Sequence, residues 1–297
     1  MKRLLAIILL IAATNIGLLA QSTWNLQPIP TGYPVYSSIR DIYFFNSQTG
    51  LICGGYGILA RTTDGGANWS KILSHKDNLY YAFSFFDSNT GWVGGRNYYG
   101  FELLKKTTDG GQTWDSLFFD GGGIFYDIMF TDINTGFAAG IYLKKTTNGG
   151  LNWFVIDPTS AYEYHHLYFV NSNTGWVSKN HYSDPTYEFT VKLQKTTNGG
   201  QNWFLQINET NEFNNAIEDI EFINSNTGYI ATADSGVFKT TNGGNNWIHT
   251  NSGSGGNMFF LNANTGWISN SNSIRRTTNG GLNWEAEIVT QYSVILY

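Results

Sequence analysis

Apolar and polar residues alternate along this chain in short runs, and turn-forming residues separate one run from the next. The run AIEDIEF (216–222) alternates with the two-residue period of a β-strand that buries one face. No segment carries a convincing helical period. The pattern predicts an all-β chain built from short strands and tight turns.

Two sequence phrases alternate through the chain six times and set the organisation of the fold. One opens on phenylalanine and closes on Thr-Gly, and its copies begin at Phe44, Phe85, Phe130, Phe169, Phe222 and Phe260. The other runs from a basic residue through Thr-Thr and Gly-Gly to tryptophan, at 61–69, 106–114, 145–153, 195–203, 239–247 and 276–284. Sequence phrases that recur every few tens of residues are typical of solenoids and propellers.

Each repeat has room for four strands. The first ends at the repeated phenylalanine, and the Asn-rich phrase after it is a turn in which Asn and Gly are expected to supply positive φ. An aromatic-led run forms the second strand, the Lys-Thr-Thr run the third, and the tryptophan after Gly-Gly opens the fourth. This arrangement predicts a β-propeller of four-stranded antiparallel blades, with six complete repeats plus partial strands of a seventh.

The two ends of the repeat region do not amount to whole blades. Trp24 stands where a fourth strand would start, with no blade before it. Tyr297 follows Trp284 at the same offset as Phe260 follows Trp247, which is where a seventh first strand would end. Either six blades close with extra strands, or a seven-bladed design is incomplete here and the chain is truncated at its C-terminus.

The first twenty residues have the layout of a secretory signal peptide. Lys2 and Arg3 form a basic start, residues 4–19 are mostly apolar, and Ala20 is a small residue before a polar stretch. We expect residues 1–20 to be a signal peptide and residues 21–297 a single propeller domain, exported to the periplasm, the cell surface or the medium. A retained N-terminal anchor is the alternative.

Charge and cysteine content exclude several classes of partner. Signal cleavage removes two of the 17 basic residues, which leaves 15 against 22 acidic ones and a net charge of −7. No lysine or arginine cluster occurs outside the repeat positions, whereas nucleic-acid binders generally have a basic face, so neither nucleic acid nor an anionic membrane is an expected partner. The single cysteine, Cys53, excludes an intrachain disulfide framework and is expected to be a buried small hydrophobe.

The tryptophan phrase fits the Asp-box pattern S/T-x-D-x-G-x-x-W. Asp64 and Asp109 keep the acid, and Asn replaces it in the other four copies. The structural Asp-box residues are Thr62, Asp64, Gly66, Trp69, Asp109, Gly111, Trp114, Gly150, Trp153, Gly200, Trp203, Gly244, Trp247, Gly281 and Trp284. With the phenylalanine phrase, the sequence resembles the photosystem II assembly/stability factor-like family of Asp-box (BNR-like) propellers, in its exported bacterial type. The resemblance implies that the acid or amide caps the turn and that the tryptophan packs between blades. It matches scaffold residues, so it implies no role in photosystem assembly.

Loop lengths predict that one face of the propeller is uniform and the other variable. Phenylalanine to glycine is always six residues and threonine to tryptophan always seven, whereas the other two connections range from 10 to 21 and from 13 to 20 residues. Long loops on a rigid scaffold are where binding sites usually form. The candidate binding residues on these loops are Arg96, Tyr98, Tyr99, Tyr162, Tyr164, His166, His181, Tyr182, Asp184 and Tyr187. The alternative is that these aromatic residues pack back on the disc.

A ring of mostly polar residues is expected around the central channel, three positions before each repeated phenylalanine. Its members are Asp41, Ala82, Asp127, His166, Asp219 and Asn257. Hydrogen bonding to the backbone of the neighbouring blade is the expected role, and a ligand or cation ring is the alternative. The adjacent pair His165 and His166 is weak support for a metal site, because neighbouring strand residues point to opposite faces. We predict no metal and no cofactor.

Three functions fit these features. The first is a non-catalytic exported propeller that binds a protein or glycan through its variable-loop face, with no catalytic residue. The second is a sialidase-like Asp-box glycoside hydrolase, but only Arg40 and Arg96 lie outside the signal and the repeat pattern, whereas sialidases need three such arginines. Facing carboxylates for another glycosidase could come from Glu163, Asp184 and Glu188. The third is a structural segment of a larger surface protein. The oligomeric state stays open.

Overall fold

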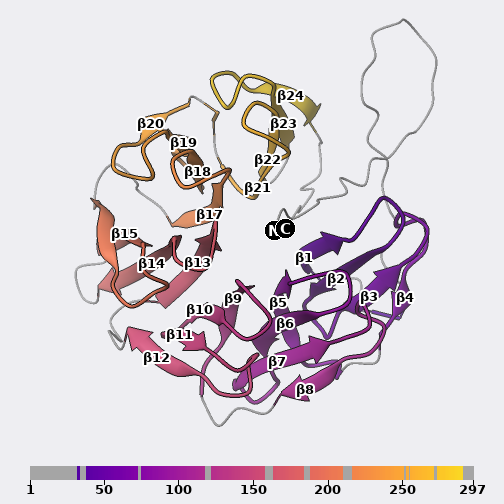
Figure 1. Cartoon of the computed structure of the whole chain (residues 1–297). Coiled ribbons are helices and arrows are strands. Elements are labelled where there is room, and N and C mark those ends of the chain that lie inside the picture. Colours follow the sequence, from indigo (N-terminus) through magenta and orange to yellow (C-terminus); the bar gives the residue numbers. More distant parts are fainter. Residues whose placement is uncertain are drawn as a thin grey trace, which may run out of the picture.

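The computed structural model describes residues 32–33, 38–72, 75–117, 122–157, 163–183, 188–209, 216–250, 252–253, 255–270 and 273–289. Within these ranges the chain forms six four-stranded antiparallel sheets, set as blades around a central channel (Figure 1). This confirms the predicted all-β propeller with six blades. The predicted signal peptide and the predicted partial strands of a seventh blade lie outside the described residues.

Each blade takes four consecutive strands, paired in chain order. Blade 1 has β1 (Ile39–Phe44), β2 (Gly50–Gly54), β3 (Leu59–Thr62) and β4 (Ser70–Lys71); blade 2 has β5 (Leu79–Phe85), β6 (Gly91–Arg96), β7 (Glu102–Thr107) and β8 (Asp115–Leu117); blade 3 has β9 (Phe125–Phe130), β10 (Gly136–Gly140), β11 (Leu143–Thr146) and β12 (Phe154–Asp157). Blade 4 has β13 (Glu163–Phe169), β14 (Gly175–Ser183), β15 (Glu188–Thr196) and β16 (Phe204–Glu209); blade 5 has β17 (Ile217–Phe222), β18 (Gly228–Thr232), β19 (Gly236–Thr240) and β20 (Ile248–His249); blade 6 has β21 (Met258–Phe260), β22 (Gly266–Asn270), β23 (Ser273–Thr277) and β24 (Glu285–Val289).

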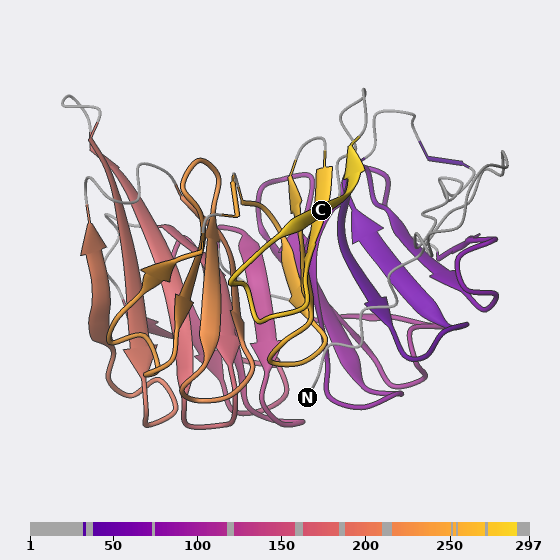
Figure 2. The ribbon, with the colours of Figure 1, turned by 90° about the horizontal axis from the view of Figure 1, so that it is seen from above.

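The first strand of each blade is the innermost, and the antiparallel order then fixes which loops share a face. Turns after the first and third strands lie on one face, and connections after the second and fourth strands lie on the other (Figure 2). The two constant-length turns therefore share a face, as predicted, and both variable sets share the opposite one. On that variable-loop face β14 and β15 extend as the longest hairpin, paired from Gly175–Thr196 to Ser183–Glu188.

The turn after each first strand differs from the expectation of positive φ. Among the described residues, Tyr56 is the non-glycine residue with positive φ, and the asparagines of these turns are not. In blade 1 the Asn46 carboxamide oxygen instead accepts the backbone N–H groups of Gln48 and Thr49, both at 2.9 Å. The glycine that follows is needed for space, because a Cβ on Gly50 would lie 2.7 Å from the ring of Phe44. This turn is closed by a side-chain cap and a ring packed on glycine.

The Asp-box turn has the same construction in all six blades. In blade 1 the Thr62 hydroxyl accepts the N–H of Gly66 at 2.9 Å, and the Asp64 carboxylate accepts the N–H of Asn68 at 2.8 Å. Where Asn replaces the acid, as at Asn148, its side-chain oxygen accepts the corresponding N–H at 2.9 Å. Asn therefore performs the same capping as Asp, and the predicted structural role of these residues is confirmed.

Neighbouring blades join through buried aromatic side chains and repeated cations. Trp92 of blade 2 is fully buried and stacks on Phe130 of blade 3 with ring centroids 3.6 Å apart. Its indole N–H donates to the carbonyl of Gly149 at 3.0 Å. The repeated lysines work in the same interfaces: Lys145 of blade 3 donates to the carbonyl of Gly199 in blade 4 at 2.6 Å. The repeated basic residues thus hold blades together.

Two further expectations concern single features. Cys53 is fully buried, as predicted, and burial raises the pKa of its thiol well above the ordinary value. Across the part of the chain that the structure describes, we find no helix with the length and apolar character to cross a membrane.

Candidate functional site

The innermost strands carry a repeated irregularity at the end that lies toward the variable-loop face. In blade 1, Asp41 pairs with Cys53 and Ile39 with Gly54, which leaves Arg40 as the extra residue of a β-bulge. The same register shift occurs in the first strands of blades 2 to 5 and extrudes Tyr81, Tyr126, one of the pair His165 and His166, and Glu218. A β-bulge changes the direction of a side chain, and bulges are common beside binding sites.

In blades 1, 3 and 5 the residue after the bulge is an aspartate that bonds its blade to the next. One oxygen of Asp127 accepts the N–H of Ile128 in its own strand at 2.8 Å, and the other accepts the N–H of Leu167 in blade 4 at 3.0 Å. Asp41 and Asp219 make the same pair of bonds, to blades 2 and 6. We call these three residues the carboxylate clips. They confirm the expected bonding to the backbone of the neighbouring blade for three of the six ring positions.

The extruded residues of blades 1 to 4 touch in sequence and form an arc, here called the bulge arc and defined as Arg40, Tyr81, Tyr126 and His165. The Arg40 guanidinium lies over the Tyr81 ring, 4.9 Å from its centroid. Tyr81 meets Tyr126 edge to face at 5.6 Å, and Tyr126 stacks on His165 at 4.7 Å. A cation and three rings from four different blades therefore form one continuous contact surface.

Glu163 places an acid at one end of the bulge arc. Its carboxylate lies 3.4 Å from the hydroxyl of Tyr126 and 3.7 Å from Nε2 of His165. Burial, with the nearby Glu163 charge, raises the pKa of Tyr126 to about 12. Burial lowers the pKa of His165 below 6.5, although the Glu163 charge opposes that shift. At neutral pH both rings are uncharged and the acid carries the charge of this group.

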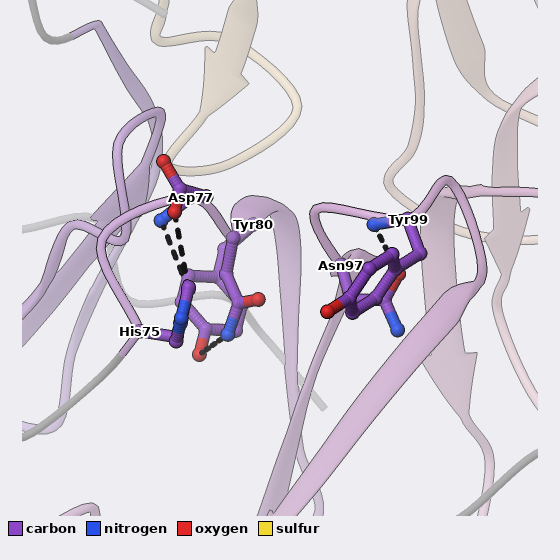
Figure 3. Close-up of polar contacts among 6 residues, drawn as sticks. His75, Asp77, Tyr80, Asn97 and Tyr99 are labelled. Atoms are coloured by element: carbon purple, nitrogen blue, oxygen red, sulfur yellow. Dashed lines mark hydrogen bonds and ion pairs between the residues drawn. The ribbon is translucent and has the colours of Figure 1, made fainter.

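A tyrosine-bearing hairpin rises from blade 2 on the same face. Tyr98 and Tyr99 are 67% and 77% exposed, and their rings meet edge to face at 5.5 Å. The Asn97 side chain accepts the N–H groups of Tyr99 and Phe101, both at 3.0 Å, so the backbone of the hairpin tip is held in place. Figure 3 shows this hairpin and the preceding connection of blade 1, where His75 and Asp77 form their own ion pair.

The structure places the predicted binding residues in different surroundings. Tyr98, Tyr99 and the exposed end of β6, Arg96, lie on the variable-loop face as predicted, and His166 lines the channel. Tyr164 was expected on the recognition surface but is fully buried, in a cluster with Phe137 and Phe169 and other residues of blades 3 and 4, where a ligand cannot reach it. Outside the described residues or side chains lie Tyr162, His181, Tyr182, Asp184 and Tyr187.

The central channel encloses a cavity of about 290 Å³. Its lining includes Arg40, Tyr81 and Tyr126 together with the polar ring. In each carboxylate clip both oxygens already accept backbone N–H groups, so these acids are committed to holding the blades. Among the described residues, no group of three or more His, Cys, Asp or Glu side chains could hold a metal ion.

Comparison with known proteins agrees with this architecture. Residues 17–122 match the family model described as Photosynthesis system II assembly factor YCF48. The solved structure of YCF48 bound to D1 peptide has a TM-score of 0.63 at 18% identity, over 88% of this chain and 82% of that one. YCF48 from Cyanidioschyzon merolae gives a TM-score of 0.61 at 17% identity, over 87% and 86%. Residues 17–122 therefore resemble the photosystem II assembly factor family, and the solved structures show that the chain shares the propeller fold.

The YCF48-like propeller also shares its fold with an enzyme. An ancestral GH74 enzyme has a TM-score of 0.63 at 15% identity, over 84% of this chain but 40% of its own. At these identities the structural likeness shows the fold alone. No curated protein matches the sequence.

Sequence reasoning missed the bulge arc of this YCF48-like propeller. The polar ring was found from its constant offset to the phenylalanine, but the extruded residues stand one position earlier and share no chemistry. Their identities, Arg, Tyr, Tyr, His and Glu, vary from blade to blade, whereas the phenylalanine four positions later is the same in each of these blades. That contrast is the signal that could have identified them, because side chains that build the blades repeat, whereas side chains that contact a ligand need not.

Proposed function

We propose that this chain is an exported, non-catalytic propeller that binds a polypeptide segment on its variable-loop face, at the mouth of the central channel. The observation that carries the proposal is the bulge arc: one backbone device in four blades brings Arg40, Tyr81, Tyr126 and His165 into one contact surface. Aromatic and arginine side chains in partly buried positions are typical of binding hot spots. The solved YCF48 bound to D1 peptide supports a peptide as the class of ligand.

The chemistry of the channel supports binding over catalysis. A glycosidase needs a facing carboxylate pair, one of them free to give or take a proton. The carboxylate clips instead have both oxygens engaged with backbone N–H groups, which holds them in place. The aromatic residues beside them offer contact area at small entropic cost, because a tyrosine has two side-chain torsions.

The test is selection from a displayed library of random peptides on the chain from residue 21. Tyr81→Ser with Tyr126→Ser should lower the affinity of a selected peptide by at least about tenfold, equivalent to about 1.4 kcal/mol. Phe154→Ser with Phe204→Ser is the matched control, because these aromatic residues are exposed on the outer strands, and it should leave binding unchanged. A glycan array probed in parallel that gives binding while the peptide library gives none would refute the proposal.

A further inference from the structure

The end of the bulge arc at blade 4 has a chemistry of its own. We infer that Tyr126, Glu163 and His165, here called the acid–aromatic cluster, receive a basic side chain, lysine or arginine, of the bound segment. This inference rests on the proposed function and specifies the ligand of the same site. It is carried by the contacts of three side chains from two adjacent blades and by the charge balance around them.

The charge of the cluster comes from Glu163. Its side chain is 53% exposed, and its carboxylate lies 3.7 Å from Nε2 of His165. The His165 imidazole is neutral at neutral pH because burial lowers its pKa. A neutral imidazole does not compensate a carboxylate, so the cluster keeps about one negative charge. A cation from outside is the group that would balance it.

The geometry suits a cation better than a neutral group. Tyr126 and His165 are stacked at 4.7 Å and lie beside the carboxylate, so an ammonium or guanidinium that reaches Glu163 also meets aromatic rings. Charge-assisted hydrogen bonds to a carboxylate are about twice as strong as neutral ones, and contact with an aromatic face adds about 0.5–2 kcal/mol. Glu218, exposed at the bulge of blade 5, adds a second acid on the same side of the mouth.

Arginines on the other side of the mouth set the direction of the segment. Arg40 stands on blade 1, and Arg96 ends β6 on blade 2, from where its charge acts on Tyr126. An acidic residue is favoured near these arginines and disfavoured near Glu163 and Glu218. The segment would therefore lie with its basic residue toward blades 4 and 5. Because Arg96 repels a cation in the cluster, removing its charge should strengthen the preference for lysine.

The experiment compares selections from the displayed random-peptide library on the wild type, Glu163→Gln and the control Glu285→Gln, an exposed glutamate on the outer strand β24. We expect enrichment of Lys and Arg on the wild type and on the control, and its loss on Glu163→Gln. Replacing the enriched lysine of a selected peptide by methionine should cost about tenfold in affinity on the wild type and under about twofold on Glu163→Gln. On Arg96→Gln the cost should exceed tenfold.

The outcomes separate this inference from the proposed function. Peptides that bind through Tyr81 and Tyr126 without basic residues, or a lysine-to-methionine cost that is equal on wild type and Glu163→Gln, would overturn the inference and leave peptide binding intact. A wild type that selects no peptide above background would overturn both. Thermal unfolding of Glu163→Gln beside the wild type establishes that a lost preference reflects charge, since a half-exposed isosteric change should leave the midpoint nearly unchanged.

Discussion

The carboxylate clip at Asp127 gives the sharpest test of how the blades are held together. Asp127 is 9% exposed, and its two oxygens accept one backbone N–H from its own strand and one from the next blade. Asp127→Ala removes both acceptors and leaves two buried N–H groups facing a methyl group. Water reaches this place poorly, so most of the loss should appear in the free energy of unfolding.

The magnitude follows from the two bonds. An unsatisfied buried polar group costs about 1–3 kcal/mol, so two of them predict a loss of about 2–6 kcal/mol for Asp127→Ala. Asp127→Asn keeps one oxygen and turns an amide NH₂ toward the second N–H, so it should cost about half as much. Blade 2 has Ala82 at this position and is linked to blade 3 by a different bond, from the N–H of Phe130 to the Ser84 hydroxyl at 2.8 Å.

The assay is urea unfolding with amide hydrogen exchange at Leu167 as the local measurement. A lower midpoint at unchanged slope reports lost stability, and faster exchange at Leu167 locates the loss at the clip. Glu285→Ala, on an exposed outer strand, is the control and should stay within about 0.5 kcal/mol of the wild type. A change for Asp127→Ala as small as that of the control would show that the carboxylate bonds contribute nothing to blade packing.

Three further predictions concern the repeats and one buried ion pair. Trp92→Ala should lower the free energy of unfolding by about 3–5 kcal/mol by calorimetry or urea unfolding, and Trp92→Phe by less, because the inter-blade stack survives. Hydrogen bonds lower the pKa of Asp64, and at Asp109 burial raises the pKa but hydrogen bonds outweigh it. These acids therefore stabilise the fold above the ordinary pKa of 3.8, and that stabilisation is lost as the pH falls through their lowered pKa values. Replacing both by Asn, as in the other four blades, should flatten the acid unfolding curve followed by circular dichroism and change stability little at pH 7. Lys144→Met should lower the free energy of unfolding by about 3–5 kcal/mol, because it leaves the Glu102 carboxylate, 4% exposed, without its cation. Adding Glu102→Leu should restore most of that stability.

The sequence predicted the scaffold well because scaffold residues are copied. Six tryptophan phrases and six phenylalanine phrases predicted six complete repeats, the strand order and the constant face, and left six or seven blades open. The expected positive φ in the turns after the first strands was wrong in mechanism, since a cap by Asn46 and a ring packed on Gly50 close the turn. Local propensity does not distinguish these two ways of closing a turn, because Asn and Gly favour both.

The candidate site was harder to predict, because its geometry depends on backbone register. Tyr126 and His165 come from strands that are distant in sequence, and only the bulge in each strand brings their rings together. Strict alternation would send Tyr164 and His166 to one face, and the sequence does not reveal the extra residue that changes this. The burial of Tyr164 and the exposure of the bulge arc have the same cause, a one-residue shift of register.

The interfaces between blades combine two chemistries in proportions that no single repeat reveals. Carboxylate clips stand in blades 1, 3 and 5, whereas tryptophan follows Thr-Gly in blades 2, 4 and 6, at Trp92, Trp176 and Trp267. Trp92 and Trp176 are fully buried, stack on a phenylalanine of the next blade and donate to a carbonyl there. Blades 2–3 and 4–5 are thus joined by buried indole surface, and blades 3–4 by the Asp127 clip across phenylalanine rings.

Asp127→Ala should accordingly raise amide exchange at the boundary of blades 3 and 4 and leave Phe130 and Phe222, beyond the indole interfaces, protected. Uniform acceleration in all blades would show instead that the interfaces between blades are equivalent and that the propeller opens as one unit.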